Sequence, residues 1–331
     1  MLTIKLAIIY ILISSSIIYL SIYLEYYDKP NQRAIHRIPT INTGGLIIYS
    51  FFLSVVSLGE FNHNIELIVT IGFFVCLTGF VDDRINLNPS NKIVLILIPS
   101  IYLILSGISI NDLGQYEYLG NLELGKFKIP FLLMAIGLLI NATNYIDGID
   151  GLLLTFFLSC LLYYIFLIDD SKTVNLLKFF VIASFFNLIL NLLPSKSKFK
   201  VFSGDSGSLF IGFFISFMTI ELYNSFNIHP AFLIWPLWYP VYDFLFVSIN
   251  RLLNKKSIFK PDNTHLHHVI SKKFYGNRIS PLILFLIVNS SIIFIGYNIS
   301  EISKALSLSI FVIGFTLFFI VRLSIFKKFK N

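Results

Sequence analysis

Residues 144–168, "NYIDGIDGLLLTFFLSCLLYYIFLI", place two Asp-Gly pairs directly in front of an uninterrupted apolar run. The run from residue 151 to 168 contains no charged residue, and a helix needs about 17 to 25 apolar residues to cross a membrane. An unpaired carboxylate inside a bilayer costs on the order of 3 kcal/mol on insertion scales. The stretch therefore predicts a transmembrane helix with two functional aspartates at its entrance.

The composition of the whole chain supports a membrane fold. Its 331 residues are 56% hydrophobic and 13% charged, with a mean hydropathy of +0.80, whereas soluble domains have about 25% charged residues. Apolar runs of the required length recur along the chain and predict an all-α polytopic membrane protein with about 11 transmembrane helices. With no low-complexity segment or linker visible, residues 1–331 are expected to form a single transmembrane domain. The predicted spans are 4–25, 43–59, 65–81, 92–109, 129–144, 151–168, 174–193, 207–223, 230–250, 281–298 and 304–325.

The distribution of Lys and Arg predicts the orientation. Alternate loops share a membrane face, and 18 of the 25 Lys and Arg residues fall on the face that also holds the C-terminus. Because such residues concentrate on the cytoplasmic side, we expect the N-terminus outside and the C-terminus in the cytoplasm. Residues 109–129 then form a small external hairpin. The net charge of +7 follows from this topology and attracts membrane lipids, so it requires no nucleic-acid partner.

Polar motifs collect in five loops of the predicted cytoplasmic face. Taken singly, each motif also has a plain structural interpretation. The two Asp-Gly pairs could form turns and cap the following helix, "VDDR" could be a solvated helix end, and "GDSGS" could be a capped helix start. The five segments are "DKPNQRAIHRIPTINTGG" (28–45), "GFVDDRINLNPSNK" (79–92), "NATNYIDGIDG" (141–151), "FSGDSGS" (202–208) and "KPDNTHLHH" (260–268).

Taken together, the aspartates of these loops favour a divalent cation. Five carboxylates at the same face repel one another unless a cation compensates them. Mg²⁺ fits best, and Mn²⁺ could replace it, because Mg²⁺ binds one or two carboxylates and completes its shell with water and substrate phosphates. Zinc is a minor alternative, since "HLHH" has no spaced partner pair. The five residues are Asp82, Asp83, Asp147, Asp150 and Asp205.

The ordered set of motifs, from about residue 28 to 270, resembles the polyprenyl-phosphate N-acetylhexosamine-1-phosphate transferase family (glycosyltransferase family 4). The "HLHH" segment is more similar to the N-acetylglucosamine-1-phosphate transferase branch than to the phospho-N-acetylmuramoyl-pentapeptide translocases. The resemblance implies transfer of N-acetylhexosamine-1-phosphate from a UDP-sugar to undecaprenyl phosphate with release of UMP. The N-acetylhexosamine that it favours is N-acetylglucosamine. It also implies a multi-pass protein of the bacterial inner (plasma) membrane with its active site on the cytoplasmic face, and it is compatible with a homodimer.

The resemblance assigns roles residue by residue. It implies catalytic roles for Asp82, Asp83, Asp147 and Lys92. It implies substrate binding by Asn144, Asp150, His265, His267, His268, Arg33 and His36. It implies metal binding by Asp205, Asp147 and Asp83.

Two other functions stay open at this point. A phospho-N-acetylmuramoyl-pentapeptide transferase of peptidoglycan synthesis would use the same motifs on another UDP-sugar. A cation-coupled secondary transporter, a different class, also uses intramembrane carboxylates, but its sites lie near the bilayer midplane and in inverted repeats. The clustering of the motifs at one face favours the transferase.

Overall fold

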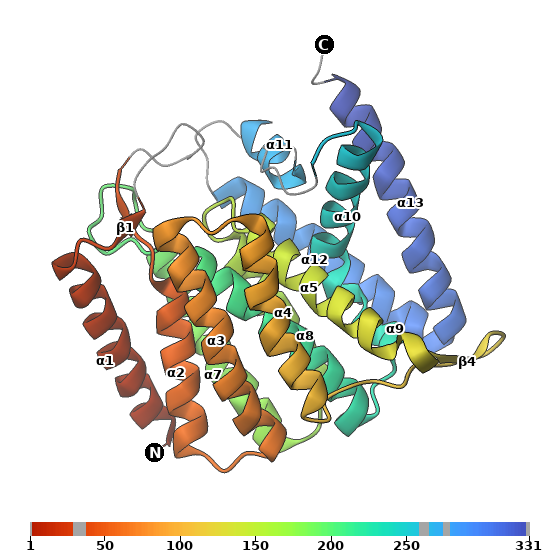
Figure 1. The fold of residues 1–331 in the computed structure, drawn as a ribbon, viewed down its shortest axis with the longest axis horizontal. Helices are drawn as coiled ribbons and strands as arrows, with labels where there is room; N and C mark the ends of the chain where they lie inside the picture. The colour runs from red at the N-terminus through yellow and green to blue at the C-terminus, as the bar shows by residue number, and fades with distance from the viewer. Residues whose placement is uncertain (1, 29–37, 258–264, 274–278, 329–331) are drawn as a thin grey trace.

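Long apolar helices packed side by side make up most of the molecule (Figure 1). The structure is a computed structural model that describes residues 2–28, 38–257, 265–273 and 279–328. Within this part of the chain, eight helical segments are long and apolar enough to cross a membrane, and three shorter apolar helices accompany them. The prediction of a polytopic helical membrane protein is confirmed. These apolar helices are α1 (Leu2–Tyr23), α2 (Gly44–Leu58), α3 (His63–Ile85), α4 (Pro89–Leu105), α5 (Lys128–Ile146), α6 (Leu152–Leu167), α7 (Ser171–Leu192), α8 (Gly204–Phe226), α10 (Trp238–Leu253), α12 (Ile279–Ile302) and α13 (Lys304–Lys328), of which α2, α4 and α6 are the shorter ones.

Two helices extend further toward the motifs than their apolar runs predicted. Helix α3 continues past residue 81 to Ile85, so the aspartate pair lies in its last turn, and Asn86 ends it in the left-handed conformation. Helix α8 begins at Gly204 instead of residue 207, so Asp205 lies in its first turn. Hydropathy marks where lipid contact ends, whereas backbone hydrogen bonds decide where a helix ends.

The segment from 230 to 250, expected to be a plain helix, is broken into three pieces. The short helix α9 (Pro230–Leu233) is followed by a 3₁₀ turn, η2 (Trp235–Leu237), and only then by α10. Pro236 has no amide hydrogen to donate to the preceding turn, so a continuous α-helix is not maintained there. The break separates the first turn of this span from the 16 residues of α10.

Helix α8 is the centre of the bundle and packs against α2, α3 and α5. Two glycines allow the close approach of its neighbours. A Cβ on Gly45 of α2 would overlap the amide of Gly207, and one on Gly79 of α3 would overlap the backbone of Asp205. Helices α2 and α3 therefore both contact the first turn of α8, which carries the "GDSGS" motif.

Two small antiparallel hairpins lie at opposite ends of the bundle (Figure 1). Strand β1 (Tyr27–Asp28) pairs with β2 (Thr40–Ile41) at the end that also carries the short helix α11 (Leu266–Lys273). Strands β3 (Asp112–Tyr116) and β4 (Gly120–Glu123) form the hairpin expected within residues 109–129.

The motif-bearing connections all lie at the end marked by β1 and α11, as far as the structure describes them (Figure 1). They include the turns between α3 and α4, between α5 and α6, and between α7 and α8. The first residues of α1 and the last residues of α13 lie at opposite ends of the bundle (Figure 1). Distant parts of the sequence thus converge on one surface.

Candidate active site

Lys92 joins two of the predicted aspartates. Its Nζ lies 2.7 Å from Asp82 Oδ2 and 2.6 Å from Asp205 Oδ2. The short connection between α3 and α4 places Lys92 beside Asp82. Within it, the Leu87 amide donates to Asp82 Oδ1 (2.7 Å), and α4 starts at Pro89, a residue suited to the first helical turn. Helices α3, α4 and α8 are thereby tied together through one cation.

Asn144, at the last turn of α5, completes this cluster. Its Nδ2 donates to Asp205 Oδ1 (2.8 Å) and to Ser208 Oγ (2.9 Å), and its Oδ1 accepts from Lys92 Nζ (3.5 Å). Residues predicted from three separate motifs are therefore in direct contact.

Asp83 has a different environment from its neighbour. Its Oδ1 accepts from the Asp205 amide (3.0 Å) and its Oδ2 from the Ser206 amide (3.4 Å), so it compensates the free N–H groups at the start of α8. Asn42, which the sequence analysis missed, donates to the same carboxylate (2.9 Å). At Gly204, where φ is +68°, a Cβ would lie 2.8 Å from Asp83 Oδ2, so this close contact requires glycine. Asp83 anchors the first turn of α8.

The two aspartates of "DGIDG" also differ from each other. Asp150 Oδ2 lies 2.6 Å from Nζ of Lys200, a lysine that is only 2% exposed and that the sequence analysis counted only as a positive charge. The partly buried Asp147 has no hydrogen-bond donor or cation within bonding distance among the described residues. Burial, and then the carboxylates of Asp205, Asp83 and Asp150, raise the pKa of Asp147 well above its ordinary value. Among the described carboxylates of the site, Asp147 is the one without a cationic or hydrogen-bonding partner.

The histidine motif packs against the same loop. A Cβ on Gly148 would lie 2.9 Å from His267 Nε2 and 2.8 Å from His268 Cε1. Tyr239 and His267 are hydrogen-bonded through the hydroxyl and Nδ1 (3.2 Å), and burial, followed by the charge of His268, lowers the pKa of His267 well below its ordinary value. His265 Nδ1 lies 2.7 Å from Asp243 Oδ2 of α10. The histidines and the aspartates thus belong to one site.

The donor set fits Mg²⁺ by its chemistry rather than as a preformed cage. Around Lys92, the described residues place four carboxylates (Asp82, Asp83, Asp147 and Asp205), an excess of negative charge. The described part of the chain contains no group of three or more His, Cys, Asp or Glu arranged to hold a metal ion by itself. Mg²⁺ commonly binds through one or two carboxylates and takes its other ligands from water and phosphates. Asp205 and Asp147 are the residues that would hold it.

The conserved sequence profile described as "Glycosyl transferase family 4" matches residues 65–223, which include all of the carboxylates around Lys92. A probable undecaprenyl-phosphate N-acetylglucosaminyl 1-phosphate transferase of Bacillus subtilis (strain 168) is 31% identical over 269 residues, covering 78% of this chain and 74% of its own length. The chain belongs to glycosyl transferase family 4.

Other relatives of this family 4 protein carry similar names. The undecaprenyl-phosphate alpha-N-acetylglucosaminyl 1-phosphate transferase of Yersinia pestis is 28% identical over 309 residues, 88% of this chain and 82% of its own. The protein of that name from Escherichia coli (strain K12) is 29% identical over 263 residues, 76% of this chain and 70% of its own. The resemblance inferred from the motifs, including the N-acetylglucosamine-1-phosphate branch, is confirmed.

Most of the predicted site of this family 4 protein comes together in space. Asp82, Lys92, Asn144 and Asp205 form one cluster of ion pairs and hydrogen bonds, Asp83 joins them through the backbone of α8, and His267 and His268 pack on Gly148. Arg33 and His36 lie outside the described residues. Four residues were missed as members of the site: Asn42, Lys200, Asp243 and Arg322.

For Asp243 and Arg322 a signal was present in the sequence. Each is a charged residue inside an apolar run, at 230–250 and 304–325, and such residues are rare in membrane helices unless they are functional or paired. Asn42 and Lys200 had no comparable signal, because both lie in loops where polar residues are ordinary.

Proposed function

We propose that the protein transfers N-acetylglucosamine-1-phosphate from UDP-N-acetylglucosamine to undecaprenyl phosphate and releases UMP. The observation that carries the proposal is the contact of Lys92 with Asp82 and Asp205, with Asn144 beside them, at one end of a bundle of membrane helices. The names of the relatives support undecaprenyl phosphate as the acceptor and N-acetylglucosamine-1-phosphate as the transferred group, and the UDP-sugar donor is part of the proposal. A charged site at the end of an apolar bundle suits one substrate from each phase, a lipid phosphate and a water-soluble nucleotide sugar.

The proposed reaction needs charge compensation more than it needs a strong base. A phosphate monoester has a second pKa of about 6, so the lipid phosphate is mostly a dianion at neutral pH. One of its oxygens attacks the sugar-linked phosphorus of the nucleotide sugar, a new P–O bond forms, and the bond to the UMP phosphate breaks with the electrons leaving on UMP. The main tasks of the protein are alignment and electrostatic stabilisation of two anions.

The side chains around Lys92 suit these tasks. Lys92 is the described cation at the centre of the site, and we assign it the pairing with a substrate phosphate. Asp82 then orients the lipid phosphate, while Asn144 and Asp150 hold the nucleotide or the sugar. His265, His267 and His268 contact the sugar or the diphosphate, and the last two of them lie against Gly148 of the "DGIDG" loop.

We further propose Mg²⁺, replaceable by Mn²⁺, as the cofactor, held by Asp205 with help from Asp147 or Asp83. When bound, it would neutralise the diphosphate of the nucleotide sugar. The excess of carboxylates, and the absence of a cationic partner for Asp147 among the described residues, support this assignment.

The distribution of Lys and Arg residues between the loops determines the membrane orientation that we propose. Each of the eight long and three shorter apolar helices crosses the inner membrane, with the N-terminus outside, the C-terminus in the cytoplasm and the site on the cytoplasmic face. The β3–β4 hairpin then lies outside. A homodimer is compatible with this arrangement.

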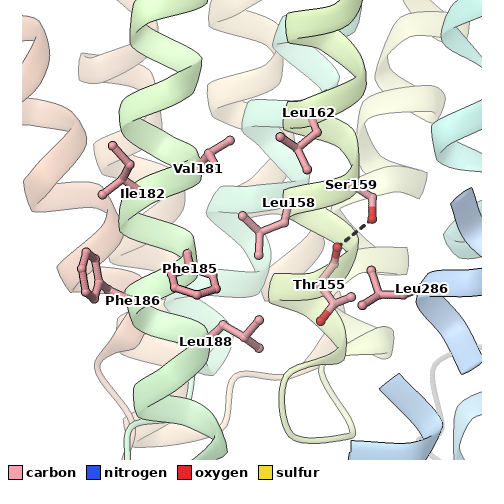
Figure 2. A pocket seen from close by; sticks show the side chains of 10 residues that line it. All are labelled: Thr155, Leu158, Ser159, Leu162, Val181, Ile182, Phe185, Phe186, Leu188 and Leu286. Carbon is pink, nitrogen blue, oxygen red and sulfur yellow. Dashed lines mark hydrogen bonds between the residues drawn. The ribbon is translucent and has the colours of Figure 1, made fainter. Parts of the chain in front are cut away.

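An apolar groove between α6, α7 and α12 is the place we propose for the prenyl tail of the lipid substrate. Figure 2 shows its lining, which includes Leu158, Val181, Phe185 and Leu286, and its volume is about 540 Å³. The groove lies close to the "DGIDG" loop, because a Cβ on Gly151 would lie 2.9 Å from the side chain of Leu188, which also lines it. A tail in this groove would bring its phosphate toward the "DGIDG" loop and Asp150.

The experiment that tests the function is an assay of UMP release by the purified protein in detergent. UDP-N-acetylglucosamine is supplied with and without undecaprenyl phosphate, in Mg²⁺ and after chelation. Release should require both the lipid phosphate and the metal. UDP-N-acetylmuramoyl-pentapeptide as the donor distinguishes the peptidoglycan reaction, and absence of UMP from every UDP-N-acetylhexosamine would exclude the transferase.

A further inference from the structure

Asp243 is a buried carboxylate that the proposed reaction does not yet use. It is 1% exposed and lies in the middle of the helical segment Pro230–Leu253, which is otherwise strongly apolar. A carboxylate at such a place is costly unless it is compensated, on the order of 3 kcal/mol on insertion scales. Its retention calls for specific partners.

Those partners come from two other parts of the fold. Asp243 Oδ2 is 2.7 Å from His265 Nδ1, and Oδ1 accepts from the backbone amide of Leu266 (2.9 Å), the first residue of α11. Nη2 of Arg322 in α13 is 3.8 Å from Oδ1, and Arg322 is itself 1% exposed. One carboxylate therefore connects α10, α11 and the last long helix of the chain.

We infer that Asp243 is a positioning residue for the transfer reaction, which fixes the ring and the proton of His265 while Arg322 compensates its charge. A neutral imidazole that donates from Nδ1 to a carboxylate has its lone pair on Nε2, so the partner selects the tautomer. The inference rests on the proposed function, because His265 acts on a substrate only if that function holds.

The surroundings of His265 support a fixed orientation. The ring of Tyr145, two residues before Asp147, lies 4.9 Å from it between centroids, and the ring of His267 stacks at 5.6 Å. Helix α11 has only eight residues, so the hydrogen bond that its first amide donates to Asp243 helps to hold the histidine motif in place. The contacts continue from the histidines to Gly148 in the aspartate loop.

The first test is Asp243→Asn, which keeps the size of the side chain but removes the charge that fixes the proton on Nδ1. In the UMP-release assay we expect kcat to fall about 10- to 100-fold with KM for UDP-N-acetylglucosamine changed less than about threefold, because the ring stays in place but its proton does not. Asp243→Glu, which retains a carboxylate, should recover part of the loss.

A double-variant cycle separates positioning from general damage. If Asp243 acts through His265, Asp243→Asn should add almost nothing to the loss caused by His265→Gln, because coupled residues are non-additive. The matched control is Glu221→Gln, which alters another buried carboxylate, at the end of α8 far from Asp205. The loss of turnover that it causes should simply multiply with the loss caused by His265→Gln. Losses that multiply in the Asp243 and His265 cycle, or full turnover of Asp243→Asn, would overturn the inference.

A spectroscopic measurement keeps the inference testable if the proposed function fails. Nitrogen-15 NMR of histidine-labelled protein, assigned with His265→Gln, should show the proton on Nδ1 of His265 in the native protein and a changed signal in Asp243→Asn. An unchanged His265 signal would contradict the positioning role whatever the substrate. A native protein that releases no UMP would instead contradict the proposed function.

Discussion

Buried carboxylates occur at both ends of the helix bundle, but their partners differ in kind. At the end that carries the motifs, four carboxylates pair with the cationic side chains of Lys92, Lys200 or Arg322, whereas Asp83 accepts from amides and anchors α8. At the opposite end Glu221, 1% exposed, accepts from the neutral amides of Asn62 (3.3 Å) and Asn64 (2.9 Å). The first arrangement pairs charges and the second surrounds one charge with dipoles.

The difference indicates what each end can do. An ion pair can exchange one partner for a bound anion or cation, so a charged ligand can enter without leaving a buried charge uncompensated. The amides around Glu221 offer no such exchange, and they fix the start of α3 against α8. The motif end is suited to charged ligands, and the other end to structural stability.

The largest effect should come from Asp205→Asn, since Asp205 contacts both Lys92 and Asn144 and is the first proposed metal ligand. We expect turnover to fall by about 10²- to 10³-fold, the usual loss when one preorganised electrostatic group is removed. The measurement is UMP release per folded protein. Glu221→Gln is the control, which should keep its turnover while its unfolding temperature falls.

Near-normal turnover of Asp205→Asn would contradict the site. A loss of turnover in Glu221→Gln as large as that in Asp205→Asn would remove the distinction between the two ends.

A smaller but more diagnostic effect is expected for Lys92→Met. Removing the cation leaves Asp82 and Asp205 without their shared partner, so turnover should fall about 10- to 100-fold. Because Lys92 and a metal ion compensate the same carboxylates, Mn²⁺ should bind the variant more tightly than the native protein in the absence of substrate. Electron paramagnetic resonance titration measures this, and weaker Mn²⁺ binding would mean that Lys92 and the metal do not share ligands.

The ion pair of Asp150 with Lys200 should stabilise the loop between α5 and α6, in addition to the substrate-binding role proposed for Asp150. Lys200→Met removes a buried cation 2.6 Å from the carboxylate, and we expect about 1–3 kcal/mol of destabilisation with a turnover loss of about tenfold or less. In the double variant with Asp150→Asn the destabilisation should be smaller than the sum of the two. Thermal unfolding in detergent measures it, and strictly additive losses would show that the pair is not coupled.

The same comparison explains what the sequence could predict. Helices and their approximate positions followed from apolar runs, because lipid contact selects such runs directly. The motif residues followed from their order along the chain. Lys200 and Asn42 could not be found in this way, because whether a loop residue reaches a carboxylate depends on how α7 and α8, or α2 and α3, cross in space. Asp243 and Arg322 stood out as charges within apolar runs, but only the packing of α10 against α13 pairs them.

The smallest expected effect concerns Glu117, in the β3–β4 hairpin at the end opposite the site. Its carboxylate accepts from the amides of Lys304 and Ala305 (both 2.8 Å) at the start of α13, and these bonds lower its pKa to about 2 from an ordinary value of 4.5. A lowered pKa in the folded state means that the stabilisation is fully present above pH 4.5 and is lost as the pH falls toward 2. The unfolding temperatures of the native protein and Glu117→Gln should therefore differ slightly at pH 6 and converge as the pH falls toward about 2. Turnover at neutral pH should be equal in the two proteins, since this carboxylate fixes a helix end and takes no part in the charge exchange at the site. A difference in unfolding temperature that persists in acid would show that hairpin packing, rather than the charge, connects Glu117 to α13.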